Sequence, residues 1–123
     1  MDGNRRWAKQ HMLQTLLGHQ EGRKRLEEMI ELCYNESMEY CSFWAIAKKN
    51  IENRSPEELS YLFQILVDSI ENLVSQFLEK GIKFEWVGNP EILPRHIVEL
   101  LNTTQEKLKN GTKMTFILGI GYG

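Results

Sequence analysis

The first ten residues, MDGNRRWAKQ, place an acid, a glycine and two arginines close together in the chain. The carboxylate of Asp2 suits a hard cation such as Mg²⁺, and Gly3 allows the backbone to approach a ligand closely. Arg5 and Arg6 offer fork-shaped donors that match phosphate oxygens. These residue types together indicate a diphosphate site with a metal. The alternative interpretation is a frayed, solvated terminus.

The elements that must position such a site follow from the hydrophobic pattern, which alternates between helical and strand-like periods. Residues 20–34 carry one apolar helical face, and residues 40–47, YCSFWAIA, form a short and nearly continuous apolar run. Such a run is typical of a strand that is buried on both faces of a parallel sheet. Two more strands are predicted at 82–88 and 113–120, with a helix from about 94 to 108 between them.

The longest predicted helix, 55–80, has explicit start and stop signals. Ser55 is a good N-cap, Pro56 suits the first helical position, and Glu58 completes a capping box. Gly81 is a plausible stop. An apolar face runs along the whole helix and comprises Leu59, Leu62, Phe63, Leu66, Ile70, Leu73, Val74 and Phe77.

Helices and strands therefore alternate along the chain, which predicts the α/β class: three layers, with a mostly parallel sheet flanked by helices on both faces. In such sheets ligands bind beyond the carboxyl ends of the strands, so chemistry is expected just after Ala47, Val87 and Ile120. The turn at residues 2–7 would join this edge if a strand preceded it. Only Met1 precedes this turn in the sequence, so we expect an incomplete domain.

Composition limits the function classes. The chain has 123 residues, 41% hydrophobic and 26% charged, with a net charge of -2, which fits one soluble domain and gives no case for a nucleic-acid binder. No apolar run approaches a membrane span, and no signal-peptide pattern is present. Cys33 and Cys41 lack zinc-site spacing and are interpreted as small buried residues of a reduced, cytoplasmic protein.

The ordered motifs resemble those of the cis-prenyltransferases, the undecaprenyl diphosphate synthase family. MDGNRRWAKQ resembles the family's DGN-x-RWA signature, and LGHQEG resembles its GH-x-x-G. FWAIAKKNIENRSPEEL stands in the place of the aromatic-Ala-Phe-Ser-x-Glu-Asn-Trp-x-Arg stretch and the helix after it. IKFEWVGNPEILP and MTFILGIGYG resemble two later strands with their turns. The resemblance covers the whole chain, which in turn covers about half of a usual family member.

The resemblance implies a reaction in which isopentenyl diphosphate elongates an allylic diphosphate and forms cis double bonds. It implies that Asp2 holds Mg²⁺ and is catalytic, and that Asn50 helps to position or accept the proton lost after condensation. Arg54 matches a family arginine near the diphosphate when one extra residue is allowed. The implied substrate-binding residues are Gly3, Asn4, Arg5, Arg6, Trp7, His19 and Arg54, with Trp7 packed behind the cradle.

Four positions depart from the family pattern. Ala47 stands where the family carries serine, Lys49 replaces a glutamate, Ile51 replaces an aromatic residue, and Thr15 replaces an arginine. These changes affect proton handling and phosphate affinity. Two functions therefore stay open: an active cis-prenyltransferase, and a non-catalytic diphosphate-binding or partner subunit of a prenyltransferase complex. A generic α/β phosphate-binding domain is a third interpretation.

The resemblance also implies how the chain relates to a whole enzyme. Residues 1–123 would be the amino-terminal half of the domain, without its first strand and without the carboxy-terminal third that holds the isopentenyl diphosphate site. The complete enzyme would be a cytoplasmic homodimer that associates peripherally with membranes through its lipid product. In the family a helix next to the site lines a tunnel for the growing chain, so the apolar surface of 55–80 serves either that tunnel or an ordinary core.

Overall fold

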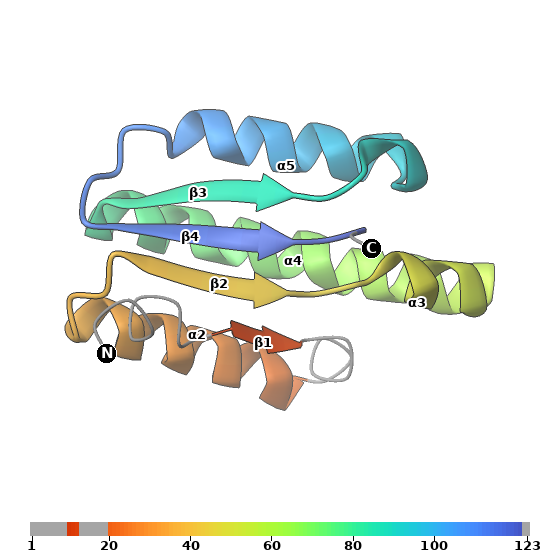
Figure 1. The fold of residues 1–123 in the computed structure, drawn as a ribbon, viewed down its shortest axis with the longest axis horizontal. Helices are drawn as coiled ribbons and strands as arrows, with labels where there is room; N and C mark the ends of the chain where they lie inside the picture. The colour runs from red at the N-terminus through yellow and green to blue at the C-terminus, as the bar shows by residue number, and fades with distance from the viewer. Residues whose placement is uncertain (1–9, 13–19, 122–123) are drawn as a thin grey trace.

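The computed structural model describes residues 10–12 and 20–121, which form a parallel sheet with helices (Figure 1). Every helix and strand predicted above is present, with boundaries that shift by a few residues. The short strand β1, the short helix α3 and the 3₁₀ helix η1 were not predicted. The elements in chain order are β1 (Gln10–Met12), α2 (Gln20–Asn35), β2 (Tyr40–Trp44), α3 (Lys48–Asn53), α4 (Pro56–Lys80), β3 (Ile82–Val87), η1 (Pro90–Ile92), α5 (Arg95–Lys107) and β4 (Met114–Gly119).

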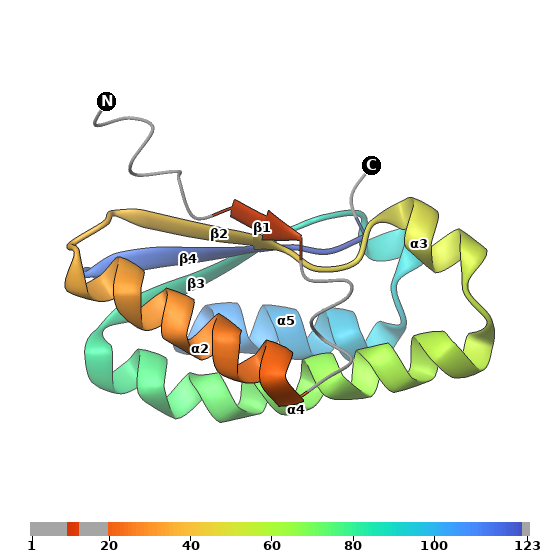
Figure 2. The same ribbon diagram turned by 90° about the horizontal axis from the view of Figure 1, so that it is seen from below.

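The four strands lie in the order β1-β2-β4-β3, and every neighbouring pair is parallel. This confirms the predicted α/β class and the parallel sheet. Figure 2 shows α2, α4 and α5 on the same side of the sheet, so the described residues show two of the three predicted layers. The helix-covered face carries buried Phe84, Phe116 and Leu118, whereas the opposite face includes half-buried Ile117.

Helix α4 has the predicted termini. The Ser55 hydroxyl accepts the Glu58 N–H at 3.2 Å, and the Glu58 carboxylate accepts the Ser55 N–H at 3.5 Å. At the other end Gly81 adopts a left-handed conformation with φ 74°, and its N–H donates to the Phe77 carbonyl. These bonds satisfy backbone N–H and C=O groups that have no partner within the helix at its ends. Because they join residues close in sequence, the boundaries could be predicted from the sequence.

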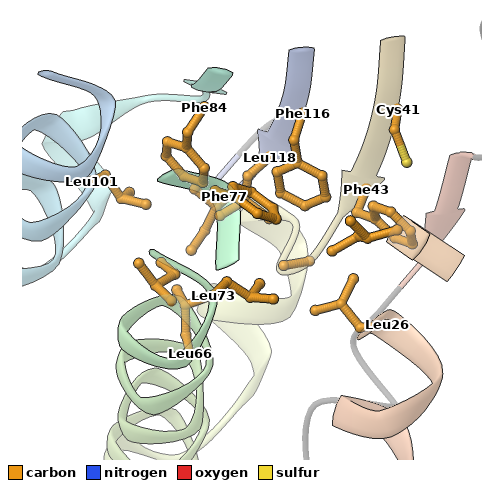
Figure 3. Packing of buried hydrophobic residues seen from close by; sticks show 14 of the residues in the cluster. Leu26, Cys41, Phe43, Leu66, Leu73, Phe77, Phe84, Leu101, Phe116 and Leu118 are labelled. Atoms are coloured by element: carbon orange, nitrogen blue, oxygen red, sulfur yellow. The ribbon is translucent and has the colours of Figure 1, made fainter. Parts of the chain in front are cut away.

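The core is centred on four aromatic rings. Figure 3 shows the rings of Phe43, Phe77, Phe84 and Phe116 gathered between the strands and α4. The Phe116 ring centroid lies 5.4 Å from those of Phe43 and Phe77 and 6.0 Å from that of Phe84. Phe116 thus joins β2, β3, β4 and α4, which positions the carboxyl ends of all three strands.

Helix α5 protects the outer edge of β3. The backbone N–H of Trp86 donates to the Gln105 side-chain oxygen at 3.1 Å, and the Trp86 indole N–H donates to Asn102 Oδ1 at 2.9 Å. An unpaired edge strand can pair with other chains. The amide of Gln105 satisfies one edge group of β3 and fixes α5 beside the strand.

A tight turn connects α2 to β2. The Met38 N–H donates to the Cys33 carbonyl and the Ser37 N–H to the Tyr34 carbonyl, both at 3.1 Å. This pair of bonds is the Schellman pattern, which places its turning residue in the left-handed region. Ser37 has φ 57° there, a position that glycine usually occupies.

Ser37→Gly is therefore expected to raise the free energy of unfolding by about 0.5–1 kcal/mol, because relief of the Cβ crowding outweighs the extra freedom of glycine in the unfolded chain. Urea denaturation followed by circular dichroism measures the change. Ser37→Ala keeps the Cβ and should give no gain. Equal stability of the glycine and alanine variants would mean that the turn carries no strain.

Candidate functional site

The predicted site edge lies where β2, β3 and β4 end. Because these strands are parallel, their arrowheads point the same way in Figure 1. Backbone hydrogen bonds join the segments that leave them: the Ala45 N–H donates to the Gly119 carbonyl at 2.7 Å and the Ile120 N–H to the Val87 carbonyl at 2.9 Å. The Asn89 N–H donates to the Gly121 carbonyl at 3.1 Å. The segments that follow β2, β3 and β4 are thus held together by hydrogen bonds, and we call them the floor of the site.

Two glycines allow this close approach. A Cβ on Gly88, which has φ 152°, would lie 1.6 Å from the Ile120 carbonyl oxygen. A Cβ on Gly119 would lie 2.1 Å from the indole ring of Trp44. Any side chain at either position would push the floor segments apart. These glycines were noticed in the sequence only as parts of motifs, and their packing role requires the neighbouring strand.

The segment that resembles the second family motif starts at this edge. Ala47 is the N-cap of α3 and makes no side-chain capping bond. Asn50 lies in the middle of α3, and Arg54 is its C-cap residue. The replacement of the family serine by Ala47 therefore leaves α3 without the hydroxyl that could cap it. Lys49 is exposed and Ile51 is half-buried.

The Arg54 guanidinium forms an ion pair with Glu58, the glutamate of the α4 capping box. Its Nη1 lies 3.5 Å from Glu58 Oε2, and its side chain is 31% exposed. A partly exposed pair of this kind contributes only about 0.2–0.5 kcal/mol. The guanidinium can therefore leave Glu58 for an anion with more charge at little cost. This second role of Glu58 was not predicted from the sequence.

The first motif lies outside the described residues. This applies to Asp2, Gly3, Asn4, Arg5, Arg6, Trp7 and His19, and to the departure at Thr15. Their gathering around a diphosphate stays a prediction. Within residues 10–12 and 20–121, no group of three or more His, Cys, Asp or Glu side chains could hold a metal ion.

An open groove beside α3 was missed by the sequence analysis. Its volume is about 470 Å³, and it lies between the α3–α4 corner and the η1–α5 corner. Apolar side chains such as Ile51, Phe63 and Leu93 line it together with Glu91 and His96. The available signal was the pair of prolines, Pro90 and Pro94, that bracket Ile92 and Leu93.

The apolar surface of α4 serves mainly as core. Leu62, Phe63, Leu66 and Ile70 are buried. A cavity beneath the sheet, between α4 and β4, has a volume of only about 20 Å³, which is room for about one water molecule. This cavity is too small to hold a prenyl chain. None of their helices combines the length and the apolar character that crossing a membrane requires.

Comparisons with known proteins match the whole chain. A family model described as putative undecaprenyl diphosphate synthase matches residues 1–123. A ditrans,polycis-undecaprenyl-diphosphate synthase of Micrococcus luteus, (2E,6E)-farnesyl-diphosphate specific, is 29% identical over 100% of this chain and 49% of its own length. A tritrans,polycis-undecaprenyl-diphosphate synthase of Thermoplasma volcanium, geranylgeranyl-diphosphate specific, is 32% identical over 99% of this chain and 48% of its own. The chain thus spans about half the length of the curated relatives it matches.

Solved structures share the fold. A probable undecaprenyl diphosphate synthase from Campylobacter jejuni superposes with a TM-score of 0.79 at 21% identity, covering 93% of this chain and 53% of that one. Lavandulyl diphosphate synthase from Lavandula x intermedia, solved in complex with dimethylallyl diphosphate, gives a TM-score of 0.69 at 21% identity, covering 93% of this chain and 54% of that one. At these identities the two structures support the fold alone.

Proposed function

Because the chain belongs to the undecaprenyl diphosphate synthase family of prenyltransferases, we propose that it carries the allylic diphosphate half of a cis-prenyltransferase site. The reaction would condense isopentenyl diphosphate with an allylic diphosphate to make a polyprenyl diphosphate. The relatives' names support the substrate class, since one is specific for farnesyl and one for geranylgeranyl diphosphate. They differ in length, so the class and not the chain length transfers to this protein.

The observation that carries the proposal is the position of the second motif. The segment from Ala47 to Arg54 leaves β2 at the carboxyl edge of the parallel sheet, where ligands of such sheets bind. Arg54 there is partly exposed, and among residues 10–12 and 20–121 its ion-pair partner is Glu58. A guanidinium in this setting is available to a diphosphate, for which its planar fork is well suited.

The chemistry of the proposed site follows from charge. When an allylic diphosphate ionises, negative charge grows on the departing diphosphate. Arg5, Arg6 and Arg54 would stabilise that charge by charge-assisted hydrogen bonds, and His19 would add one more donor. Mg²⁺, when bound by Asp2, would neutralise part of the diphosphate charge. Asn50 would act at the other end of the reaction, where a proton leaves the new double bond.

A second candidate function is a non-catalytic diphosphate-binding or partner subunit of a prenyltransferase complex. The structure favours it at one point: α3 begins at Ala47 without a capping hydroxyl, and the next position that departs from the family, Lys49, points an exposed cation into solvent. Both changes lie in the segment that would handle the proton. Both candidates bind the diphosphate in the same way, so binding and turnover have to be measured separately.

Calorimetric titration of the 123-residue chain with farnesyl diphosphate, with and without Mg²⁺, tests the proposal. We expect binding that strengthens with Mg²⁺. Arg54→Ala should weaken it about 10–150-fold, because a hydrogen bond to a charged group contributes about 1.5–3 kcal/mol. Glu58→Gln keeps a capping side chain while it removes the competing charge, and should bind at least as tightly as the parent.

Arg95→Ala is the matched control for Arg54→Ala, since Arg95 also pairs with a glutamate four residues on, at 3.3 Å, and is not a predicted site residue. Incorporation of radiolabelled isopentenyl diphosphate separates the two candidates when the chain is completed with the carboxy-terminal part of a relative, because the resemblance places the isopentenyl diphosphate site in that part. Binding with chain growth supports the enzyme, and binding without growth favours the partner subunit. A folded sample that binds no diphosphate contradicts both.

A further inference from the structure

The chain contains two cysteines, and the fold brings them together. Cys33 lies in the last turns of α2 and Cys41 in β2. The Cys41 thiol donates to the Cys33 sulfur with 3.2 Å between the two sulfur atoms, and both residues are fully buried. Neither is a predicted site residue or part of the family motifs described above. The sequence separation of eight positions gave no indication of this contact.

The pair joins the end of α2 to the start of β2. Its chain neighbours Leu32 and Tyr40 are large side chains that are 43% and 38% exposed. The turn between the two cysteines contains Ser37, whose backbone is in the left-handed region. Both sulfurs are buried, so oxidation requires a brief local opening where α2 turns into β2. Such an opening would let an oxidant reach the sulfurs.

We propose that Cys33 and Cys41 are a redox-active dithiol that closes to an intramolecular disulfide between α2 and β2. Sulfur atoms in a disulfide are about 2.05 Å apart, so side-chain rotation and a small shift of the turn between α2 and β2 have to bring the pair together. No other cysteine competes, since the sequence has only these two. The proposal is independent of the proposed function and goes beyond it.

The oxidant class is an organic disulfide such as oxidised glutathione. One cysteine, as its thiolate, attacks an oxidant sulfur and releases one reduced thiol, which leaves a mixed disulfide on the protein. The second cysteine then attacks the protein sulfur of that mixed disulfide and releases the second reduced thiol. Two S–H bonds of the protein are replaced by one S–S bond. The oxidant's S–S bond becomes two thiols, which take up the two protons.

The expected consequence is a more stable domain. The disulfide would close a loop of nine residues, counting both cysteines, and cross-links remove conformational freedom from the unfolded chain. By the chain-entropy relation, a loop of this size should raise the melting temperature by roughly 5–10 °C in a domain of this length. The reduced protein would keep the thiol contact and the lower melting temperature.

The test uses the full chain. The reduced protein is incubated with oxidised glutathione under native conditions, and then intact mass, free thiols after unfolding, and the melting temperature are measured. We expect loss of two hydrogen atoms, loss of both free thiols, a monomer on non-reducing gels, and a higher melting temperature that dithiothreitol reverses. Cys33→Ala and Cys41→Ala should each stop at the mixed disulfide and show no rise in melting temperature.

A second probe keeps the proposal falsifiable where an alanine variant folds poorly. Phenylarsine oxide bridges two neighbouring thiols with loss of one water molecule, so the parent should gain one phenylarsenic group and lose two hydrogens. A parent that keeps both thiols through prolonged oxidation and takes up no arsenical overturns the proposal. Oxidation only to disulfide-linked dimers, or a melting temperature that falls on oxidation, overturns it as well.

Discussion

Phe116→Ala is expected to lower the free energy of unfolding by about 3–5 kcal/mol, the range for large-to-small changes of buried aromatic residues. Phe116 is 2% exposed and contacts the rings of Phe43, Phe77 and Phe84. Its removal leaves a cavity at the point where three strands and α4 meet. Since domains have only about 5–15 kcal/mol of stability in total, the variant should unfold at a much lower urea concentration.

The neighbouring residue on β4 supplies the control. Thr115 points to the opposite face of the sheet and is half-buried, so Thr115→Ala should cost less than about 1 kcal/mol by the usual scale for such positions. Urea unfolding followed by tryptophan fluorescence measures both variants, and the slope of each transition should stay unchanged. Similar midpoints for the two variants would show that the aromatic cluster does not hold the sheet together.

The elements that sequence could predict are those fixed by neighbours in the chain. The start and the end of α4 follow from Ser55, Glu58 and Gly81, which make their hydrogen bonds within a few residues. The short apolar runs likewise identified β2, β3 and β4 as strands. These signals are local, so no knowledge of the tertiary fold was needed to interpret them.

The arrangement of those elements depends on contacts between distant residues. β2 and β4 are direct neighbours, with Phe43 opposite Leu118, although β3 lies between them in the chain. Periodicity shows which residues are buried and does not show on which face of the sheet a helix packs. The sequence therefore predicted helices on both faces of the sheet, whereas α2, α4 and α5 all lie on one face in the described part of the chain (Figure 2). β1, with three residues, is too short to give a period.

The candidate site was predictable to the same extent. The motif pattern predicts Asn50 and Arg54 just after a strand, and α3 does follow β2 at the carboxyl edge. The contact between Arg54 and Glu58 depends on how α3 ends and α4 begins, and the 3.2 Å contact between Cys33 and Cys41 depends on how α2 folds back onto β2. Local patterns indicate residue types for chemistry, whereas the partners of those residues come from the fold.

Asp2→Ala is expected to remove the part of diphosphate binding that depends on Mg²⁺. In the proposed site Asp2 would hold Mg²⁺, which would neutralise part of the diphosphate charge, so Mg²⁺ and the diphosphate should each strengthen the binding of the other by the same factor. In the parent protein, the affinity for farnesyl diphosphate should rise about 10–100-fold between Mg²⁺-free and Mg²⁺-saturated conditions, a coupling of about 1–3 kcal/mol. In Asp2→Ala the two affinities should be equal, while the arginines still give weak binding.

Asp68→Ala is the matched control, because Asp68 is an exposed aspartate on α4 whose carboxylate accepts a hydrogen bond from Gln64 at 3.1 Å. It should keep the full dependence on Mg²⁺. Asp2→Asn retains an oxygen ligand of the same shape without the negative charge. Because hard cations prefer carboxylates, this variant should lose most of the increase in affinity that Mg²⁺ gives the parent. If the affinity of Asp2→Ala rose with Mg²⁺ as that of the parent does, Asp2 would not hold the metal. Residues 2–7 would then bind the diphosphate through the arginines alone.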